Sequence, residues 1–196
     1  MDLRPYRGGF LRPFGCGWFI REFLLGNGPE GSPKINPQAG ACQEDIFYQY
    51  KIALHKSYAE DAIAYENEER IKQDKPIYTD EEYQERLAYF MGRMPYKLFK
   101  CRYHSFQRYF HWLKQLGWVQ FTGQEEAAAM QDHYPPAPPR RFYHLTTKGI
   151  EAPDHQWSNP QLTLYPERGL EYFREKRREH RYSKKAPTMS HRRHRV

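Results

Sequence analysis

The sequence predicts a mainly α-helical protein with one small antiparallel β-hairpin and flexible termini. Residues 43–72 contain no glycine or proline, and their apolar side chains recur at steps of three or four, the period of an amphipathic helix. Two short segments, residues 118–122 and 141–146, are typical of strands. Glycine and proline in residues 1–41 and dense basic charge in residues 183–196 favour irregular ends.

The positive charge of the chain is concentrated at its C-terminus. The whole sequence has 31 Lys+Arg and 24 Asp+Glu, a net charge of +7. Residues 1–165 hold 20 of each sign, whereas residues 166–196 hold 11 basic and 4 acidic residues. A basic extension on a neutral body is typical of binding to a polyanion such as DNA or RNA, and a merely solvated tail is the alternative.

Two further observations indicate where the protein works. The three cysteines are an odd number at wide spacings, which favours reduced thiols over a disulfide framework. The longest apolar stretch near the N-terminus, residues 17–25, is interrupted by Arg21 and Glu22, so it is typical neither of a membrane span nor of a signal peptide. We therefore expect an intracellular, cytoplasmic protein with no membrane partner, associated with the nucleoid if its source is prokaryotic.

The first half of the chain divides into an arm and a long helix. Residues 1–42 are expected to form a Gly/Pro-rich arm whose apolar segment, residues 18–25, docks on the body. The long amphipathic helix occupies residues 43–76, including the stop that Pro76 supplies. This helix is a candidate for binding a partner or for dimerisation, and packing against its own domain is the alternative.

A second helix begins after residue 78. Thr79 and Glu82 have the spacing of a capping box, in which each side chain accepts from the other's backbone N–H. The helix should end near Gly92, and Pro95 opens a short third helix over residues 95–100. The expected buried face of the second helix consists of Tyr83, Leu87, Phe90 and Met91.

A fourth helix precedes the two strands. Residues 105–116 place apolar side chains on one face, and Gly117 then ends the helix because glycine adopts the left-handed conformation at little steric cost. The sequence Leu113-x-x-Leu116-Gly117 is followed by an alternating strand, a polar connection, an aromatic strand and the sequence Leu145-Thr146-Thr147-Lys148-Gly149.

This order resembles the winged helix-turn-helix domains of many prokaryotic transcriptional regulators. The resemblance covers residues 79–149 and implies a winged helix-turn-helix domain over residues 77–150, with an added long helix before it. It further implies that residues 105–116 form the recognition helix, which lies in the major groove, and that residues 123–140 form the wing tip. Residues 151–196 would then be a linker, a short helix and the basic tail.

The candidate contacts to nucleic acid are polar residues on three segments. Arg108 and Gln107 are the leading candidates for base reading, because Arg and Gln make bidentate contacts to guanine and adenine. For Arg108 and for Gln107, the alternative is a side chain that is merely solvated. For the wing, the alternative is that its proline-rich segment serves as a peptide ligand for another protein. The full set is Arg102, His104, Ser105, Gln107, Arg108, His111 and Lys114 on the helix, Arg140, Arg141 and Lys148 around the second strand, and Arg177, Arg178 and Arg181 in the tail.

Metal binding and catalysis are not expected. Cys101, His104 and His111 include residue types that bind zinc, but the sequence offers no paired cysteine beside them. Nucleotide-binding, nucleophile-elbow and metalloprotease motifs are missing from the sequence. We therefore expect no cofactor and no enzyme.

The resulting hypothesis is a protein that binds double-stranded DNA, with DNA favoured over RNA. It would act as a transcriptional regulator or as an accessory factor of a DNA-processing complex, where other proteins could be partners. The alternative is an RNA-binding or protein-binding subunit of a ribonucleoprotein complex. Fold analogy alone does not choose between these roles.

Overall fold

Helices dominate the computed structural model, which describes residues 15–93, 102–128 and 138–169. The prediction of a mainly helical protein with a small antiparallel hairpin is confirmed, and a two-residue strand adds a third member to the sheet. In chain order the elements are α1 (Cys16–Leu24), β1 (Ala41–Cys42), α2 (Gln43–Lys72), α3 (Asp80–Arg93), α4 (Tyr103–Gln115), β2 (Val119–Glu126), β3 (Arg140–Leu145), α5 (Thr147–Glu151), α6 (Asp154–Ser158), α7 (Pro160–Leu164) and the 3-10 helix η1 (Pro166–Arg168).

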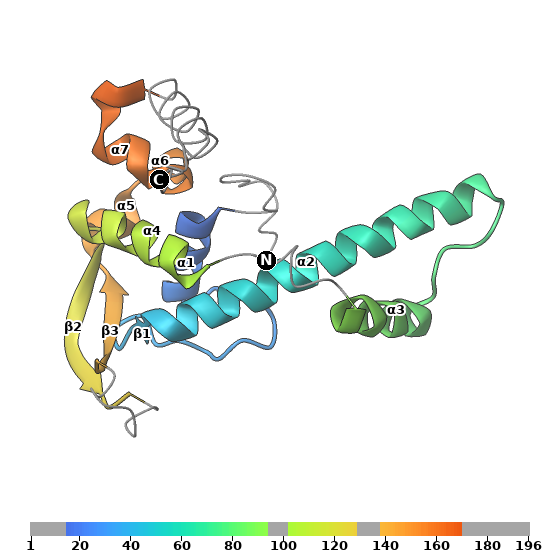
Figure 1. Cartoon of the computed structure of the whole chain (residues 1–196), viewed down its shortest axis with the longest axis horizontal. Coiled ribbons are helices and arrows are strands. Elements are labelled where there is room, and N and C mark those ends of the chain that lie inside the picture. The colour runs from blue at the N-terminus through green and yellow to red at the C-terminus, as the bar shows by residue number, and fades with distance from the viewer. Residues whose placement is uncertain (1–14, 94–101, 129–137, 170–196) are drawn as a thin grey trace, which may run out of the picture.

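Figure 1 shows a body from which one helical hairpin projects. The first half of α2 lies in the body, and its second half leaves the body and is accompanied by α3 on the way back. The last α2 residue in the core of the body is Leu54, whereas Ala59 and Ile63 are buried outside that core. We call residues 59–93 the arm.

The body is built around a core to which α1 contributes more than the sequence indicated. Residues 18–25 were expected to dock on the body from an irregular arm, and the structure forms them into α1, with Phe19, Ile20 and Phe23 almost completely buried. The ring centroids of Phe19 and Tyr50 lie 5.1 Å apart, which joins α1 to α2. The expected division at residue 42 therefore does not separate two packing units.

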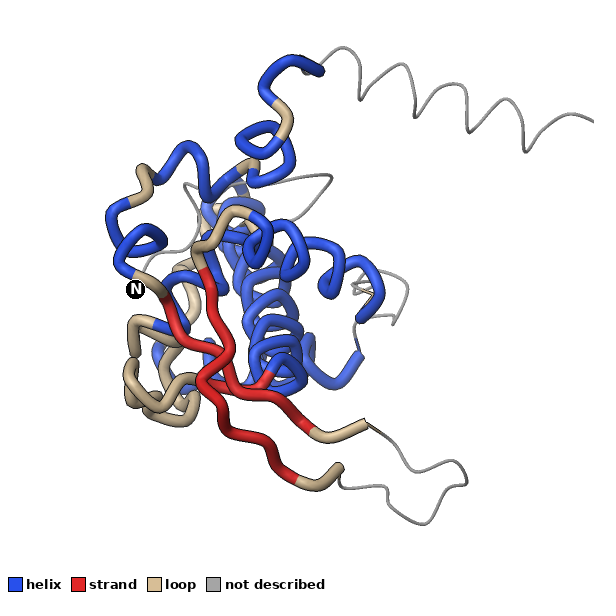
Figure 2. The backbone as a smooth tube through the Cα atoms, turned by 90° about the vertical axis from the view of Figure 1, so that its left-hand side faces the viewer, coloured by secondary structure: helices blue, strands red, loops and turns tan. Residues whose placement is uncertain are grey.

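The sheet is small and antiparallel, in the order β1-β3-β2 (Figure 2). β2 and β3 pair Val119 with Leu145 and Phe121 with Tyr143, and their register shifts between Phe121 and Glu125. Gly123, with φ +90°, lies within this irregularity. β1 pairs with the other edge of β3 and leads directly into α2, so the sheet fixes where α2 begins.

Several local predictions are confirmed. α2 begins at Gln43, as predicted, and ends at Lys72, four residues before the end of the predicted range at Pro76. The Thr79 backbone N–H donates to the Glu82 carboxylate at 2.9 Å, and the Glu82 N–H donates to Thr79 Oγ1 at 3.3 Å, which is the predicted capping box. Gly117 has φ +69° and ends α4, with its N–H donating to the Lys114 carbonyl at 3.0 Å.

The helix α3 does not join the unit that was expected for residues 77–150. It packs along α2, and its expected apolar face is half-buried because one helix covers it instead of a core. In the body, α4 packs against α7, α1 and the first half of α2. Some predictions fall outside the described residues, namely the short helix at residues 95–100, residues 129–137 of the wing tip predicted over 123–140, and the tail beyond residue 169.

No helix within the described ranges has both the length and the apolar composition needed to cross a membrane.

Candidate nucleic-acid interface

The inner face of α4 fixes this helix in the body. Phe106, Phe110 and Leu113 are completely buried at helical spacing, as the sequence predicted. The Phe106 ring lies 5.2 Å from that of Phe47 on α2, and the Phe110 ring lies 4.9 Å from that of Tyr143 on β3. These aromatic contacts orient α4 against both α2 and the sheet, so the direction of its opposite face is well defined.

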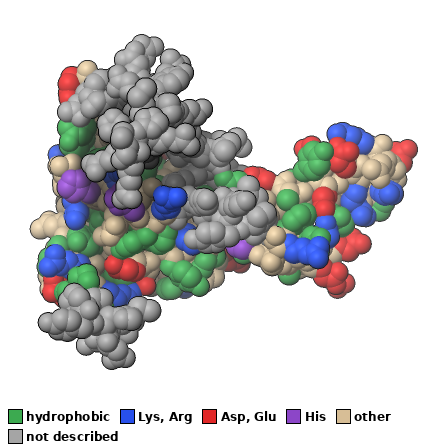
Figure 3. Space-filling model, viewed as in Figure 1, with side chains coloured by type: hydrophobic (Ala, Val, Ile, Leu, Met, Phe, Trp, Pro, Cys, Tyr) green, Lys and Arg blue, Asp and Glu red, His purple; other side chains and the backbone are tan. Residues whose placement is uncertain are grey.

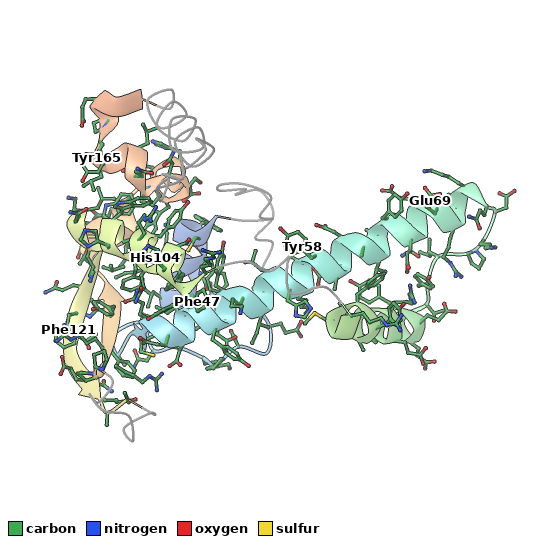
Figure 4. All side chains as sticks on the ribbon, in the orientation of Figure 1. Phe47, Tyr58, Glu69, His104, Phe121 and Tyr165 are labelled. Atoms are coloured by element: carbon green, nitrogen blue, oxygen red, sulfur yellow. The ribbon has the colours of Figure 1, made fainter. Side chains whose placement is uncertain are left out.

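The opposite face of α4 is exposed and contains every residue predicted for the helix except Ser105, which is half-buried. From His104 to Lys114 its residues are joined by three- and four-residue steps and therefore form one stripe, and the N-cap residue Arg102 precedes this stripe. α4 contains no Asp or Glu. Histidine and basic side chains are gathered along α4 in Figure 3, and Figure 4 labels His104 there. We call this stripe together with Arg102 the α4 outer face; it consists of Arg102, His104, Gln107, Arg108, His111 and Lys114.

The first turn of α4 is suited to an anion. Its N-cap residue is Arg102, which makes no side-chain capping bond, and the first turn contains no acidic residue. Unpaired N–H groups and the positive end of the helix dipole therefore coincide with a guanidinium. One carboxylate lies nearby, because the Tyr103 hydroxyl donates to Glu44 at 2.7 Å. Burial, and then this bond to Glu44, raise the pKa of Tyr103, so the phenol keeps its proton.

Side chains of the α4 outer face also interact with one another and with the body. Arg108 Nη2 lies 3.3 Å from His104 Nε2, one helical turn away. The Lys114 ammonium lies 5.6 Å from the centre of the Tyr143 ring. Such contacts limit the orientations of Arg108 and Lys114 while their charges stay exposed to solvent.

The two arginines of β3 are engaged within the protein. We expected Arg140 and Arg141 to reach phosphates, and the structure pairs both with carboxylates. Arg141 Nε donates to Glu125 at 2.7 Å, directly across the hairpin, and this bond raises the pKa of Arg141. Arg140 donates to Asp45 at 2.6 Å and lies 3.7 Å from Glu126. Their charges are therefore largely compensated before any ligand binds.

Cys42 is the third partner of Arg140 and has a structural role. Its sulfur accepts from Arg140 Nη2 at 2.6 Å and from the Asp45 N–H at 3.4 Å, where it caps the start of α2. Burial, followed by a hydrogen bond with the Asp45 side chain, raises the pKa of the Cys42 thiol to about 11, and the bond from the Asp45 backbone N–H opposes this only in part. The thiol is therefore protonated at neutral pH and poorly reactive.

The remaining predicted residues do not lie on α4. Lys148 is exposed in the short helix α5, which Thr146 caps by accepting from the Gly149 N–H at 3.1 Å. Arg177, Arg178 and Arg181 lie outside the described residues, as does Cys101, one of the three residues considered as zinc ligands. Within the described ranges, no group of three or more His, Cys, Asp or Glu side chains could hold a metal ion.

The sequence analysis did not identify the acidic residues that pair with the arginines of β3. Glu125 and Glu126 could have been found from the hairpin register, since each stands opposite an arginine. Asp45 is 95 residues from Arg140, and nothing in the sequence pattern links the two positions.

No protein-family model matches this chain, and neither the curated proteins nor the solved structures include a match.

Proposed function

We propose that the protein binds double-stranded DNA through a winged helix-turn-helix unit whose recognition helix is α4. The observation that carries this proposal is the α4 outer face, an exposed stripe of cationic and amide side chains on a helix without a single carboxylate. Its other face is held by aromatic contacts to α2 and β3. A polyanion is the ligand class that such a face attracts.

The arrangement of elements gives further support. α4 is followed at once by Gly117 and the β2–β3 hairpin, which is the order that the resemblance to winged helix-turn-helix domains implies. Two candidates for base contacts, Gln107 and Arg108, are exposed near the middle of the helix. Arg102 and the first turn would hold a backbone phosphate, which the lack of acidic residues in that turn favours.

The compensated charges of the hairpin narrow how binding would work. With Arg140 and Arg141 paired to carboxylates, affinity would come from the α4 outer face and from the basic C-terminal residues. A wing with few uncompensated charges is suited to contacts with protein rather than with a polyanion. This observation favours a second candidate function, an RNA-binding or protein-binding subunit of a ribonucleoprotein complex.

The test compares full-length variants on a DNA duplex and on an RNA hairpin across a salt series. One variant is Arg108→Ala with Lys114→Ala, and the second is the tail variant Arg177→Gln, Arg178→Gln, Arg181→Gln. Lys34→Ala is the matched control, an exposed cation in the loop after α1. We expect the α4 variant to bind the duplex roughly tenfold more weakly and to lose about one unit of salt slope per phosphate contact removed.

The outcomes separate the candidate functions. Weaker binding by the tail variant alone, with the α4 variant equal to wild type, would overturn the assignment of α4. Tighter binding to the RNA hairpin than to the duplex, reduced by the α4 variant, would establish the second candidate. A preference among DNA sequences that disappears with Gln107→Ala or Arg108→Ala would indicate a regulator.

A further inference from the structure

The arm exposes large apolar side chains far from the α4 outer face. Within the described residues, eight large hydrophobic side chains are exposed, and four of them belong to the arm. Ile71 and Ile77, at the tip, are 60% and 57% exposed, and Tyr65 and Tyr89 are 64% and 43% exposed. Apolar surface kept at the end of a projecting hairpin is typical of a contact with another protein.

The arm is held in one shape by polar contacts between its two helices. Arg86 on α3 forms an ion pair with Glu66 on α2, and Glu66 also accepts from the Tyr78 hydroxyl at 3.2 Å. The Tyr78 N–H donates to Asn67 Oδ1 at 3.0 Å, and Arg70 Nε donates to the Pro76 carbonyl at 2.7 Å. These bonds fix the turn between α2 and α3, so a partner would meet a preorganised surface.

The arm carries a net negative charge. Residues 59–93 contain 10 acidic and 5 basic residues, whereas the whole chain has a net charge of +7. The five basic side chains contact other groups of the arm: Arg70 with Pro76 and Tyr78, Lys72 with Glu69, Lys75 with Gln73, Arg86 with Glu66, and Arg93 with Tyr89. Among the described residues, only Lys72 and Arg86 of these five pair with carboxylates, and Lys72, Lys75 and Arg93 stay exposed to solvent.

Most of the acidic side chains of the arm also face solvent. Asp80 and Glu81 lie in the first turn of α3, where they also stabilise the positive end of the helix dipole. That explanation does not extend to Asp61, Glu68 or Glu85, which are exposed in the interiors of α2 and α3. Acidic and basic side chains both stand on the arm in Figure 3, and Glu69 lies near its tip in Figure 4.

We propose that the arm docks on a basic amphipathic helix of another protein. Nucleic acid is disfavoured because the arm would repel it. A second arm is disfavoured because two acidic surfaces would meet. A partner helix with an apolar stripe between basic side chains would cover Ile71 and Ile77 and would pair with exposed carboxylates of the arm.

The proposal is tested on the full-length protein with a synthetic helical probe, a labelled peptide of lysine and leucine with the leucines on one face. A glutamate and leucine peptide of the same pattern and polylysine are the control probes. The arm variant is Ile71→Ser with Ile77→Ser, and Ile150→Ser on α5, 48% exposed, is the matched control. A charge variant, Glu68→Gln with Glu85→Gln, is matched by Glu30→Gln, an exposed acid of the body.

We expect the lysine and leucine peptide to bind wild type and the Ile150→Ser control equally, and to bind the arm variant about tenfold more weakly. The charge variant should bind more weakly and with a shallower salt dependence than the Glu30→Gln control. Equal binding to wild type and the arm variant, or equal binding of the two leucine peptides, would overturn the proposal.

Two other occupants have distinct signatures. If the full chain self-associates in sedimentation and the arm variant abolishes this, the arm binds a second copy and the proposal is wrong. If the Arg108→Ala, Lys114→Ala variant binds the peptide more weakly than wild type while the arm variant binds it as wild type does, the peptide occupies the α4 outer face and the proposal is wrong. Because the arm variant leaves α4 intact, failure here is distinguishable from failure of the proposed function.

Discussion

The guanidinium of Arg86 on α3 is bound to the carboxylate of Glu66 on α2. Its Nε donates to Glu66 Oε2 at 2.9 Å, and Nη2 donates to the second carboxylate oxygen. The same guanidinium lies 4.5 Å from the centre of the Tyr89 ring and 5.0 Å from that of Phe90. No α3 side chain is fully buried, so this one residue supplies a large share of what holds α3 to α2.

Arg86→Ala should therefore loosen the arm and leave the body folded. The pair is part-exposed, so we expect a local cost of about 0.5–1 kcal/mol rather than global unfolding. Hydrogen exchange of the α3 amides should become faster, while the amides of α4 and β3 should exchange as in wild type. Lys72→Ala, which removes an exposed ion pair with Glu69, is the control. Unchanged α3 exchange in Arg86→Ala would contradict this role.

The two arginines of β3 should respond differently to truncation. Arg140 joins β3 to the start of α2 through Asp45 and Cys42, so Arg140→Ala should lower the free energy of unfolding by about 1 kcal/mol. Arg141 forms an exposed cross-strand pair, so Arg141→Ala should change stability little. Urea unfolding measures both. A strong and selective loss of duplex affinity in either variant would show that the ion pairs open to release the arginine to DNA.

Stability should decrease as the pH falls through the range of His55. Burial lowers the pKa of His55 in the folded protein below its ordinary value of 6.5, and a hydrogen bond with the Met91 backbone opposes this only in part. Below pH 6.5, His55 is therefore protonated more readily in the unfolded chain than in the folded protein, which favours unfolding. Above pH 6.5, His55 is neutral in both states. The urea midpoint should therefore fall on going from neutral to mildly acidic pH.

His55→Gln should flatten that pH profile, and His111→Gln, at an exposed position of α4, should leave it as in wild type. A profile of equal slope in His55→Gln and wild type would assign the effect to other groups.

A pair of glycine variants tests the packing of the body against that of the arm. A Cβ on Gly149 would lie 2.3 Å from the Trp118 carbonyl oxygen, so Gly149→Ala should destabilise the body by roughly 2 kcal/mol or more. Gly92 in α3 has no atom within 4 Å of such a Cβ. Gly92→Ala should be neutral or stabilising by up to about 1 kcal/mol, because alanine favours a helix. The midpoints of thermal unfolding of the two variants are compared with that of wild type. Equal shifts in the two variants would contradict this prediction.

Local sequence signals predicted the local structure well. The bounds of α2, the capping box at Thr79 and the helix end at Gly117 all depend on residues close together in the chain. The polar stripe of α4 was predictable for the same reason, because helical period alone places Arg108 opposite Phe110.

Packing between distant segments was harder to predict. Nothing in the capping box of α3 shows whether this helix packs on α4 or returns along α2, since both choices bury the same half-apolar face. The segment that forms α1 is short and surrounded by glycine and proline, so its place in the core depends on aromatic contacts such as that between Phe19 and Tyr50. The pairing of Arg140 with Asp45 could not be predicted either, because only the fold brings these two distant positions together.

The helix α2 is uninterrupted from the sheet to the tip of the arm. Its 30 residues correspond to a rod of about 45 Å. Near one end Phe47 packs on Phe106 of α4, and at the other end Ile71 faces solvent. The rigid helix would therefore hold a ligand of the arm at a fixed distance and angle from a ligand of α4. A one-residue insertion in α2 would rotate one binding site by about 100° relative to the other.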